Sequence, residues 1–224
     1  MKKKLFIAIL ITIMGFIQAC KKDAIISSES NIKEKKIFNK LDKDSTGILF
    51  SNVLTESDTL NYFTYPYLYM GGGVSAGDIN NDGLIDLFFS GNMVENKLYL
   101  NQGNLKFKDI TENAGIKGDN RWYTGTTMAD VNNDGLLDIY CLVGGQSTPK
   151  QNQLFINNGD NTFSEKSKEY GLDDVGNSVD ASFFDYDNDG DLDVFVANYP
   201  ITPFNYNSFN YKMRMDRVTN DETD

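Results

Sequence analysis

The chain has 224 residues, a formal net charge of −11 and no histidine, and 40% of its residues are hydrophobic. This composition is sufficient for a folded core, and the length allows one or two ordinary domains. The lack of histidine excludes Ser-His-Asp and Cys-His catalysis and histidine-ligated zinc, and the acidic balance argues against a nucleic-acid-binding surface, which needs cationic side chains.

The first twenty residues have the pattern of an export signal. A basic head of lysines is followed by an apolar segment at residues 5–17. This segment is too short for a permanent membrane span but has the length of a signal-peptide core. It ends at Ala19 and Cys20, which resemble the lipobox of bacterial lipoproteins. We therefore expect a signal peptide over residues 1–19 and a lipid on Cys20, with a plain secretory signal as the alternative.

The cysteines and the composition after the signal extend this interpretation. If Cys20 carries a lipid, no partner remains for an internal disulfide with Cys141. Cys141 lies in an apolar run and is expected to be a small buried hydrophobe. Residues 20–45 are polar and charged, so we interpret them as the lipidated cysteine and a flexible tether.

Residues 46–200 contain an internal repeat. The segments that begin at Asp78, Asp130 and Asp185 share the pattern Asp-x-(Asn/Asp)-x-Asp-Gly-x-x-Asp, followed by an apolar run. A second pattern, Asn-x-Leu-aromatic-aliphatic-Asn-x-Gly, recurs at residues 96–103 and 152–159. Two signatures that alternate at one period indicate stacked copies of one supersecondary unit.

Each copy is predicted to form four short strands. The runs before the acidic loops are rich in small residues, which allows strands to crowd around an axis, and the runs after the loops are apolar like strands buried on both faces. Residues 105–110 alternate apolar and polar side chains, as a half-exposed strand does. The predicted fold is therefore all-β: a partial β-propeller of about two and a half four-stranded blades, with calcium loops between the first two strands of each blade.

The ends of the repeat region are incomplete. Residues 47–56 resemble the outer strand 105–112 but have no inner strands before them. We predict that they form an outer strand that latches a blade outside this sequence. Residues 201–224 are predicted to be an irregular tail and the point of truncation, so the chain is interpreted as a fragment of a longer protein.

The acidic loops are candidate calcium sites. They place side-chain oxygens at loop positions 1, 3, 5 and 9 and can add the carbonyl of position 7, which nearly completes the six to eight oxygens that Ca²⁺ takes. Magnesium prefers a stricter octahedron, and transition metals prefer nitrogen or sulfur ligands. A hairpin turn that binds nothing explains the glycine but not the aspartates. The candidate ligands, for up to three Ca²⁺ ions, are Asp78, Asn80, Asp82, Leu84 and Asp86, then Asp130, Asn132, Asp134, Leu136 and Asp138, then Asp185, Asp187, Asp189, Asp191 and Asp193.

The third loop differs from the other two in charge. It has an additional carboxylate at position 3, Asp187, and another at position 7, Asp191. We therefore expect it to bind calcium most tightly. An EF-hand is excluded, because it needs a glutamate at position 12, where these loops have apolar or cysteine residues.

These motifs resemble the FG-GAP or VCBS repeats of integrin-alpha-like β-propellers, and especially the N-terminal part of bacterial ASPIC/UnbV-type lipoproteins. The resemblance implies a calcium ion in the hairpin between the first two strands of each blade, with ligands at Asp78, Asn80, Asp82 and Asp86 and at the equivalent residues. It also implies an extracytoplasmic location and roles in adhesion or ligand binding. Neither a full ring nor an ASPIC/UnbV-like segment is present in this sequence.

The leading interpretation is a non-enzymatic, calcium-binding lipoprotein module at the outer membrane or cell surface that contacts a protein or a glycan. The alternative is a propeller-type lyase or hydrolase that degrades polysaccharide, with acids outside the loops, such as Glu95, Glu112 and Asp180, in the catalytic roles. Aromatic side chains at Trp122, Tyr123 and residues 62–69 could stack on sugars, but packing in the core is the favoured interpretation.

Overall fold

The computed structural model describes residues 37–119, 121–145 and 149–199. The chain divides into two compact units, residues 1–40 and 41–224, and in the first unit the described residues 37–40 are exposed. The predicted signal peptide, Cys20, most of the predicted tether and the 201–224 tail lie outside the described residues. Within the described ranges, we find no helix with the length and apolar character needed to cross a membrane.

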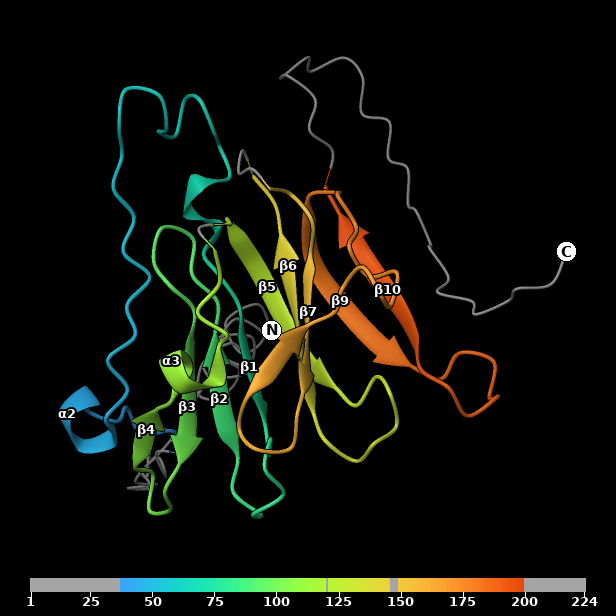
Figure 1. Ribbon diagram of the computed structural model, residues 1–224. Helices are drawn as coiled ribbons and strands as arrows, with labels where there is room; N and C mark the ends of the chain where they lie inside the picture. The colour runs from blue at the N-terminus through green and yellow to red at the C-terminus, as the bar shows by residue number, and fades with distance from the viewer. Residues whose placement is uncertain (1–36, 120, 146–148, 200–224) are drawn as a thin grey trace, which may run out of the picture. The chain divides into compact units, whose positions relative to one another are not determined.

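The described residues of the second unit form three antiparallel sheets (Figure 1). Blade one contains β1 (Val74–Gly77), β2 (Asp86–Phe89), β3 (Lys97–Asn101) and β4 (Phe107–Asp109); blade two contains β5 (Tyr123–Ala129), β6 (Asp138–Val143), β7 (Gln153–Asn157) and β8 (Phe163–Glu165); blade three contains β9 (Ser178–Phe184) and β10 (Asp193–Asn198). Short helical turns form at α2 (Lys43–Thr46), η1 (Leu68–Met70) and α3 (Thr111–Ala114). This architecture confirms the all-β prediction and fits a partial propeller.

The first strands of the blades, β1, β5 and β9, lie next to one another. Small residues make this approach possible. A Cβ atom on Gly73 would lie 2.5 Å from the backbone nitrogen of Thr126, and one on Gly125 would lie 2.8 Å from the carbonyl oxygen of Val179. Larger side chains would force the inner strands apart, which is the physical reason for the small-residue runs before the acidic loops.

Apolar side chains fill the two spaces between the blades. The cluster between blades one and two includes Phe88, Leu98, Ile139 and Phe155, and the cluster between blades two and three includes Tyr140, Leu154 and Val194. β6 contributes to both clusters, and all six of its residues are buried. Cys141 on this strand is fully buried, as predicted, and burial raises the pKa of its thiol.

Two expectations about strands are wrong. Residues 47–56 form no strand; the ring of Phe50 stacks on Phe89 at 5.1 Å, and the Leu49 N–H donates to the Tyr99 hydroxyl at 3.2 Å, so this segment packs against the side chains of β2 and β3. The outer strand of blade one begins at Phe107 rather than at residue 105. Leu105 has a φ of 56° and belongs to the turn that reverses the chain after β3.

Candidate metal centre

The predicted ligands lie in three loops that join the first and second strands of each blade (Figure 1). We call residues 78–86 loop one, residues 130–138 loop two and residues 185–193 loop three. At position 4 the loops carry Asn81, Asn133 and Asn188, with φ angles of 58°, 57° and 63°. Asparagine tolerates this left-handed conformation better than most residues, and the glycine two positions later also has a positive φ in each loop. The shared Asn-Asp-Gly sequence therefore determines the shared turn.

Backbone hydrogen bonds to acidic side chains hold loop one in shape. The carboxylate of Asp78 accepts from the N–H groups of Asp82 at 3.1 Å and Gly83 at 2.7 Å. Asp82 Oδ1 accepts from the Leu84 N–H at 2.8 Å, and its Oδ2 accepts from Asn80 Nδ2 at 3.1 Å. The side chains of positions 1, 3 and 5 are thus brought together.

Loop two has the same hydrogen bonds at the equivalent atoms. The Asp130 carboxylate accepts from the N–H groups of Asp134 at 3.0 Å and Gly135 at 2.8 Å. Asp134 in turn accepts from the Leu136 N–H at 2.9 Å and from Asn132 Nδ2 at 2.8 Å. In both loops, position 7 takes part through its backbone N–H, which donates to the carboxylate at position 5.

The aspartates at position 9 of loops one and two, Asp86 and Asp138, are 0% exposed. Each accepts one N–H from its own loop and one from the third strand of its blade. For Asp138 these donors are Val131 at 3.0 Å and Asn157 at 2.8 Å. Burial raises the pKa of Asp138 to about 6 and also raises that of Asp86, although the backbone hydrogen bonds act in the opposite direction. These carboxylates therefore anchor the loops to the sheets.

Loop three is more open and more acidic. Asp185 accepts from the Asp189 N–H at 3.2 Å, and Asp193 Oδ2 accepts from the Tyr186 N–H at 2.8 Å. One carboxylate oxygen from each of Asp185, Asp187 and Asp193 lies within 4.8 Å of the others. Among the described residues, this is the group of three acidic side chains close enough to share a cation. The side chains of Asp189 and Asp191 stand outside this group.

The chemistry of this donor set fits a hard cation. The predicted ligands offer oxygen atoms, the chain contains no histidine, and Cys141 is in the core. Carboxylate and carbonyl oxygens are what Ca²⁺ prefers, and grouped carboxylates repel one another unless a cation lies between them. Positions 1, 3 and 9 of loop three are the side chains that the structure already brings within reach of one ion.

The sequence interpretation missed the residues that connect these loops to their surroundings. Asn157, the second asparagine of the pattern at residues 152–159, donates from Nδ2 to the carbonyl oxygen of Ile79 in loop one at 2.8 Å. Asn81 donates from Nδ2 to the carbonyl oxygen of Gly135 in loop two at 3.0 Å. Loops one and two are therefore in direct contact across the blades. The recurrence of asparagine at residues 101 and 157 was the available signal.

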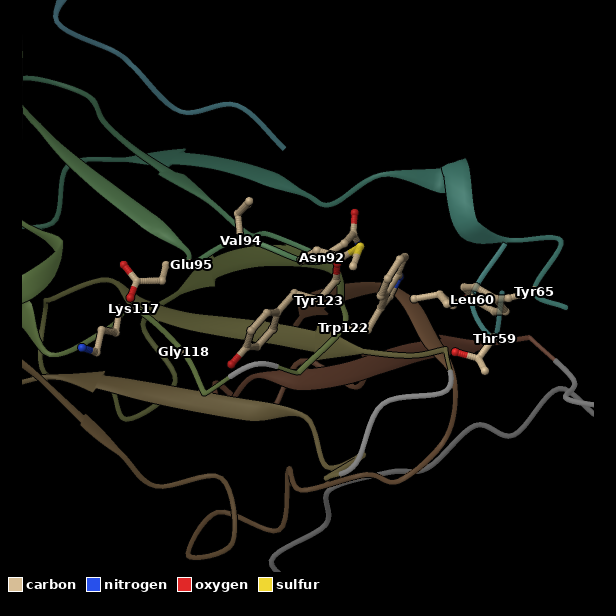
Figure 2. A pocket seen from close by; sticks show the side chains of 11 residues that line it. Thr59, Leu60, Tyr65, Asn92, Val94, Glu95, Lys117, Gly118, Trp122 and Tyr123 are labelled. Atoms are coloured by element: carbon tan, nitrogen blue, oxygen red, sulfur yellow. The ribbon is translucent and has the colours of Figure 1, made fainter. Parts of the chain in front are cut away.

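A cavity of about 690 Å³ lies near the β2–β3 connection, at the other end of β2 from loop one. Figure 2 shows Leu60 and Tyr65 at one end of the cavity and Glu95 and Lys117 at the other, with Trp122 between them. Trp122 and Tyr65 are buried and their rings meet edge to face at 5.6 Å. The expectation that Trp122 packs in the core is confirmed.

Comparisons with known proteins match the repeat region. A model of the FG-GAP-like repeat family matches residues 78–141 and 130–196, which include all three loops. The chain is also similar to cartilage acidic protein 1: it is 31% identical over 153 residues to the Xenopus tropicalis protein, covering 67% of this chain and 22% of that protein. It is 32% identical over 130 residues to the Mus musculus protein, covering 57% of this chain and 20% of that protein. The chain spans about a fifth of the length of these curated relatives.

Proposed function

The chain belongs to the FG-GAP-like repeat family, and from this premise we propose that it is a calcium-binding, extracytoplasmic propeller module that contacts a protein or a glycan. The observation that carries the proposal is the recurrence of one acidic loop in all three blades, with three carboxylates within 4.8 Å in loop three. The relatives are named after cartilage, a tissue rich in extracellular matrix, which supports an extracytoplasmic location.

Calcium would act in this module mainly by stabilising the fold. In loop three the ion would be held by Asp185, Asp187 and Asp193, and in the other loops by the aspartates and asparagines at positions 1, 3, 5 and 9. A cation would neutralise carboxylates that the turn forces together. An ion that binds the folded state alone stabilises it by about 2.7 kcal/mol per site at 100 times its dissociation constant.

The metal proposal predicts that millimolar calcium raises the melting temperature of the chain and that a chelator reverses the change. Terbium luminescence and isothermal titration would count the sites. Removing one carboxylate from each loop (Asp82→Asn, Asp134→Asn and Asp187→Ala) should remove most of the shift. The control Asp58→Asn, at an exposed carboxylate outside the loops, should leave it intact. An unchanged melting temperature in a chain that circular dichroism shows to be folded would contradict calcium binding.

We propose further that Cys20 carries a lipid that anchors the module to a membrane. The proposal rests on the lipobox-like sequence that ends at Cys20. In a bacterial host, the chain should incorporate an alkyne-labelled fatty acid and fractionate with membranes, and Cys20→Ser should lose both properties. Cleavage of the signal without incorporation of label in the unaltered chain would identify a plain secretory signal instead.

Of the acids named for the polysaccharide-degrading alternative, Glu95 lines the cavity and Asp180 is exposed on β9. Glu112 pairs with Lys117 at 3.7 Å on the surface, and Cys141 is buried with a raised thiol pKa. The name of the relatives refers to no reaction. We therefore propose a binding role without catalysis, and a screen for released reducing ends or unsaturated sugars would test it directly.

A further inference from the structure

A buried series of hydrogen bonds joins the position-9 aspartates of loops one and two. The Ile79 N–H donates to Asp86 Oδ2 at 3.0 Å, and the Ile79 carbonyl oxygen accepts from Asn157 Nδ2 at 2.8 Å. The backbone N–H of Asn157 donates to Asp138 Oδ1 at 2.8 Å. All four residues are 3% exposed or less. Two residues, Ile79 and Asn157, therefore connect two buried carboxylates that are predicted ligands in different blades.

This buried connection lies next to further predicted ligands. Ile79 stands between Asp78 and Asn80, which are positions 1 and 3 of loop one. Asn157 Nδ2 also donates to the carbonyl oxygen of Leu137, at position 8 of loop two, at 3.1 Å. Because the Asn157 side chain bonds to both loops, its position depends on the shape of each of them.

A second connection lies at the surface. Asn81 Nδ2 donates to the carbonyl oxygen of Gly135 at 3.0 Å. The N–H of the same peptide group, that of Leu136, donates to Asp134 Oδ1 at 2.9 Å. One peptide group thus links loop one to the position-5 carboxylate of loop two. Asn81 and Gly135 are exposed, so this bond contributes less than the buried connection.

We infer that loops one and two bind calcium cooperatively, so that an ion in one loop raises the affinity of the other. The inference rests on the proposed calcium binding and adds a coupling between two of the sites. An ion that holds the ligands of loop one in place would also fix Ile79 and Asn81, and with them the bonds to loop two. The second ion would then bind a loop that is already ordered, at a smaller cost in conformational entropy. Linkage requires the same coupling factor in both directions.

The charge of the loops acts in the opposite direction. Each of the two loops carries three aspartates, so a divalent ion in one loop reduces the negative charge that attracts the second ion. The aspartates at positions 1 and 5 are half-buried or exposed, and salt at about 0.15 M screens exposed charges beyond about 8 Å. Buried hydrogen bonds are not screened in this way. The coupling should therefore be positive at this salt concentration and increase at higher salt.

The test is isothermal titration of calcium into three forms of the full chain, each with binding by loop three removed by Asp187→Ala. One form keeps loops one and two, one loses loop two through Asp134→Asn, and one loses loop one through Asp82→Asn. The coupling factor is the product of the two association constants of the two-site form divided by the product of the two single-site constants. We expect a factor of about five or more. In the Asp82→Asn form, calcium should also slow hydrogen exchange at residues 78–83.

Asn81→Gly and Asn133→Gly form a matched pair that tests the surface connection. The two asparagines occupy position 4 of loops one and two with φ angles of 58° and 57°, which glycine adopts without strain. Asn81 bonds to the other loop, whereas no hydrogen bond of the Asn133 side chain is found among the described residues. Asn81→Gly should lower the coupling factor about twofold, and Asn133→Gly should leave it unchanged. Asn157→Ala, which removes the buried bond, should lower it at least as much as Asn81→Gly.

Two outcomes would overturn the coupling and leave calcium binding in place. One is a coupling factor of one or less at about 0.15 M salt in forms that circular dichroism shows to be folded. The other is an unchanged factor in both Asn81→Gly and Asn157→Ala, because neither connection would then carry the coupling. A lack of calcium binding in every folded form would contradict the calcium proposal itself, and the coupling with it.

Discussion

Replacing Asp138 by alanine is expected to lower the free energy of unfolding by about 3 kcal/mol. The Asp138 carboxylate is 0% exposed and accepts the N–H groups of Val131 and Asn157. Alanine leaves both donors buried without an acceptor, and each unsatisfied group costs about 1–3 kcal/mol. The loss of a desolvated charge offsets part of this cost. Urea unfolding in the presence of a chelator measures the effect without a contribution from bound metal.

The matched control is Asp134→Ala in the same loop. Asp134 is exposed, and its carboxylate accepts hydrogen bonds within the loop. In chelator its replacement should change stability by less than about 1 kcal/mol, as is usual for surface positions. In calcium both variants should lose the metal contribution of loop two. Equal losses for Asp138→Ala and Asp134→Ala in chelator would show that the buried carboxylate does not anchor the loop.

The repeat could be predicted from the sequence because the residues that form each loop are adjacent in the chain. The turn of each loop depends on an asparagine with positive φ followed by Asp-Gly, and these residues are adjacent in the chain. The apolar run after each loop predicts the second strand for the same reason. The anchoring of the loops to the sheets by Asp86 and Asp138 could not be predicted from the sequence. Their interpretation as ligands stays a prediction, but their burial and their hydrogen bonds depend on β3 and β7, which are distant in sequence.

The burial of individual aromatic side chains was also beyond what the local sequence predicts. Packing in the core was the favoured interpretation for residues 62–69, and it is wrong for Phe63, which is 93% exposed, and for other members of the cluster. Tyr65 is buried because its hydroxyl meets that of Tyr199 at 2.6 Å and its ring meets Trp122, whereas Tyr62 and Tyr69 are exposed. Likewise, the pattern of residues 47–56 predicts a strand, but Phe50 stacks on Phe89 and holds the segment against blade one. Contacts between distant segments outweigh local pattern in both cases.

Replacing Asn157 by alanine is expected to destabilise the chain more than replacing Asn101, its equivalent in blade one. Both side chains accept a glycine N–H in the following turn and donate to a carbonyl oxygen of their own loop. Asn157 Nδ2 also donates at 2.8 Å to the carbonyl oxygen of Ile79, a residue of loop one that is 2% exposed. Alanine at residue 157 would leave that buried acceptor unsatisfied, so Asn157→Ala should cost about 3 kcal/mol and Asn101→Ala about half as much.

The difference in the free energy of unfolding between these two variants gives the contribution of the hydrogen bond between the blades. The two asparagines make equivalent hydrogen bonds within their own blades, so those contributions are removed by the comparison. Urea unfolding in the presence of a chelator measures the free energy of unfolding of each variant without a contribution from bound metal. If the bond also holds loop one in its binding shape, Asn157→Ala should weaken the terbium signal of a chain in which metal binding by loops two and three is removed by Asp134→Asn and Asp187→Ala. Asn101→Ala in the same background measures the loss of terbium affinity that arises from contacts within blade one alone. Equal stability and equal terbium affinity for the two variants would mean that loop one takes its shape from blade one and needs nothing from its neighbour.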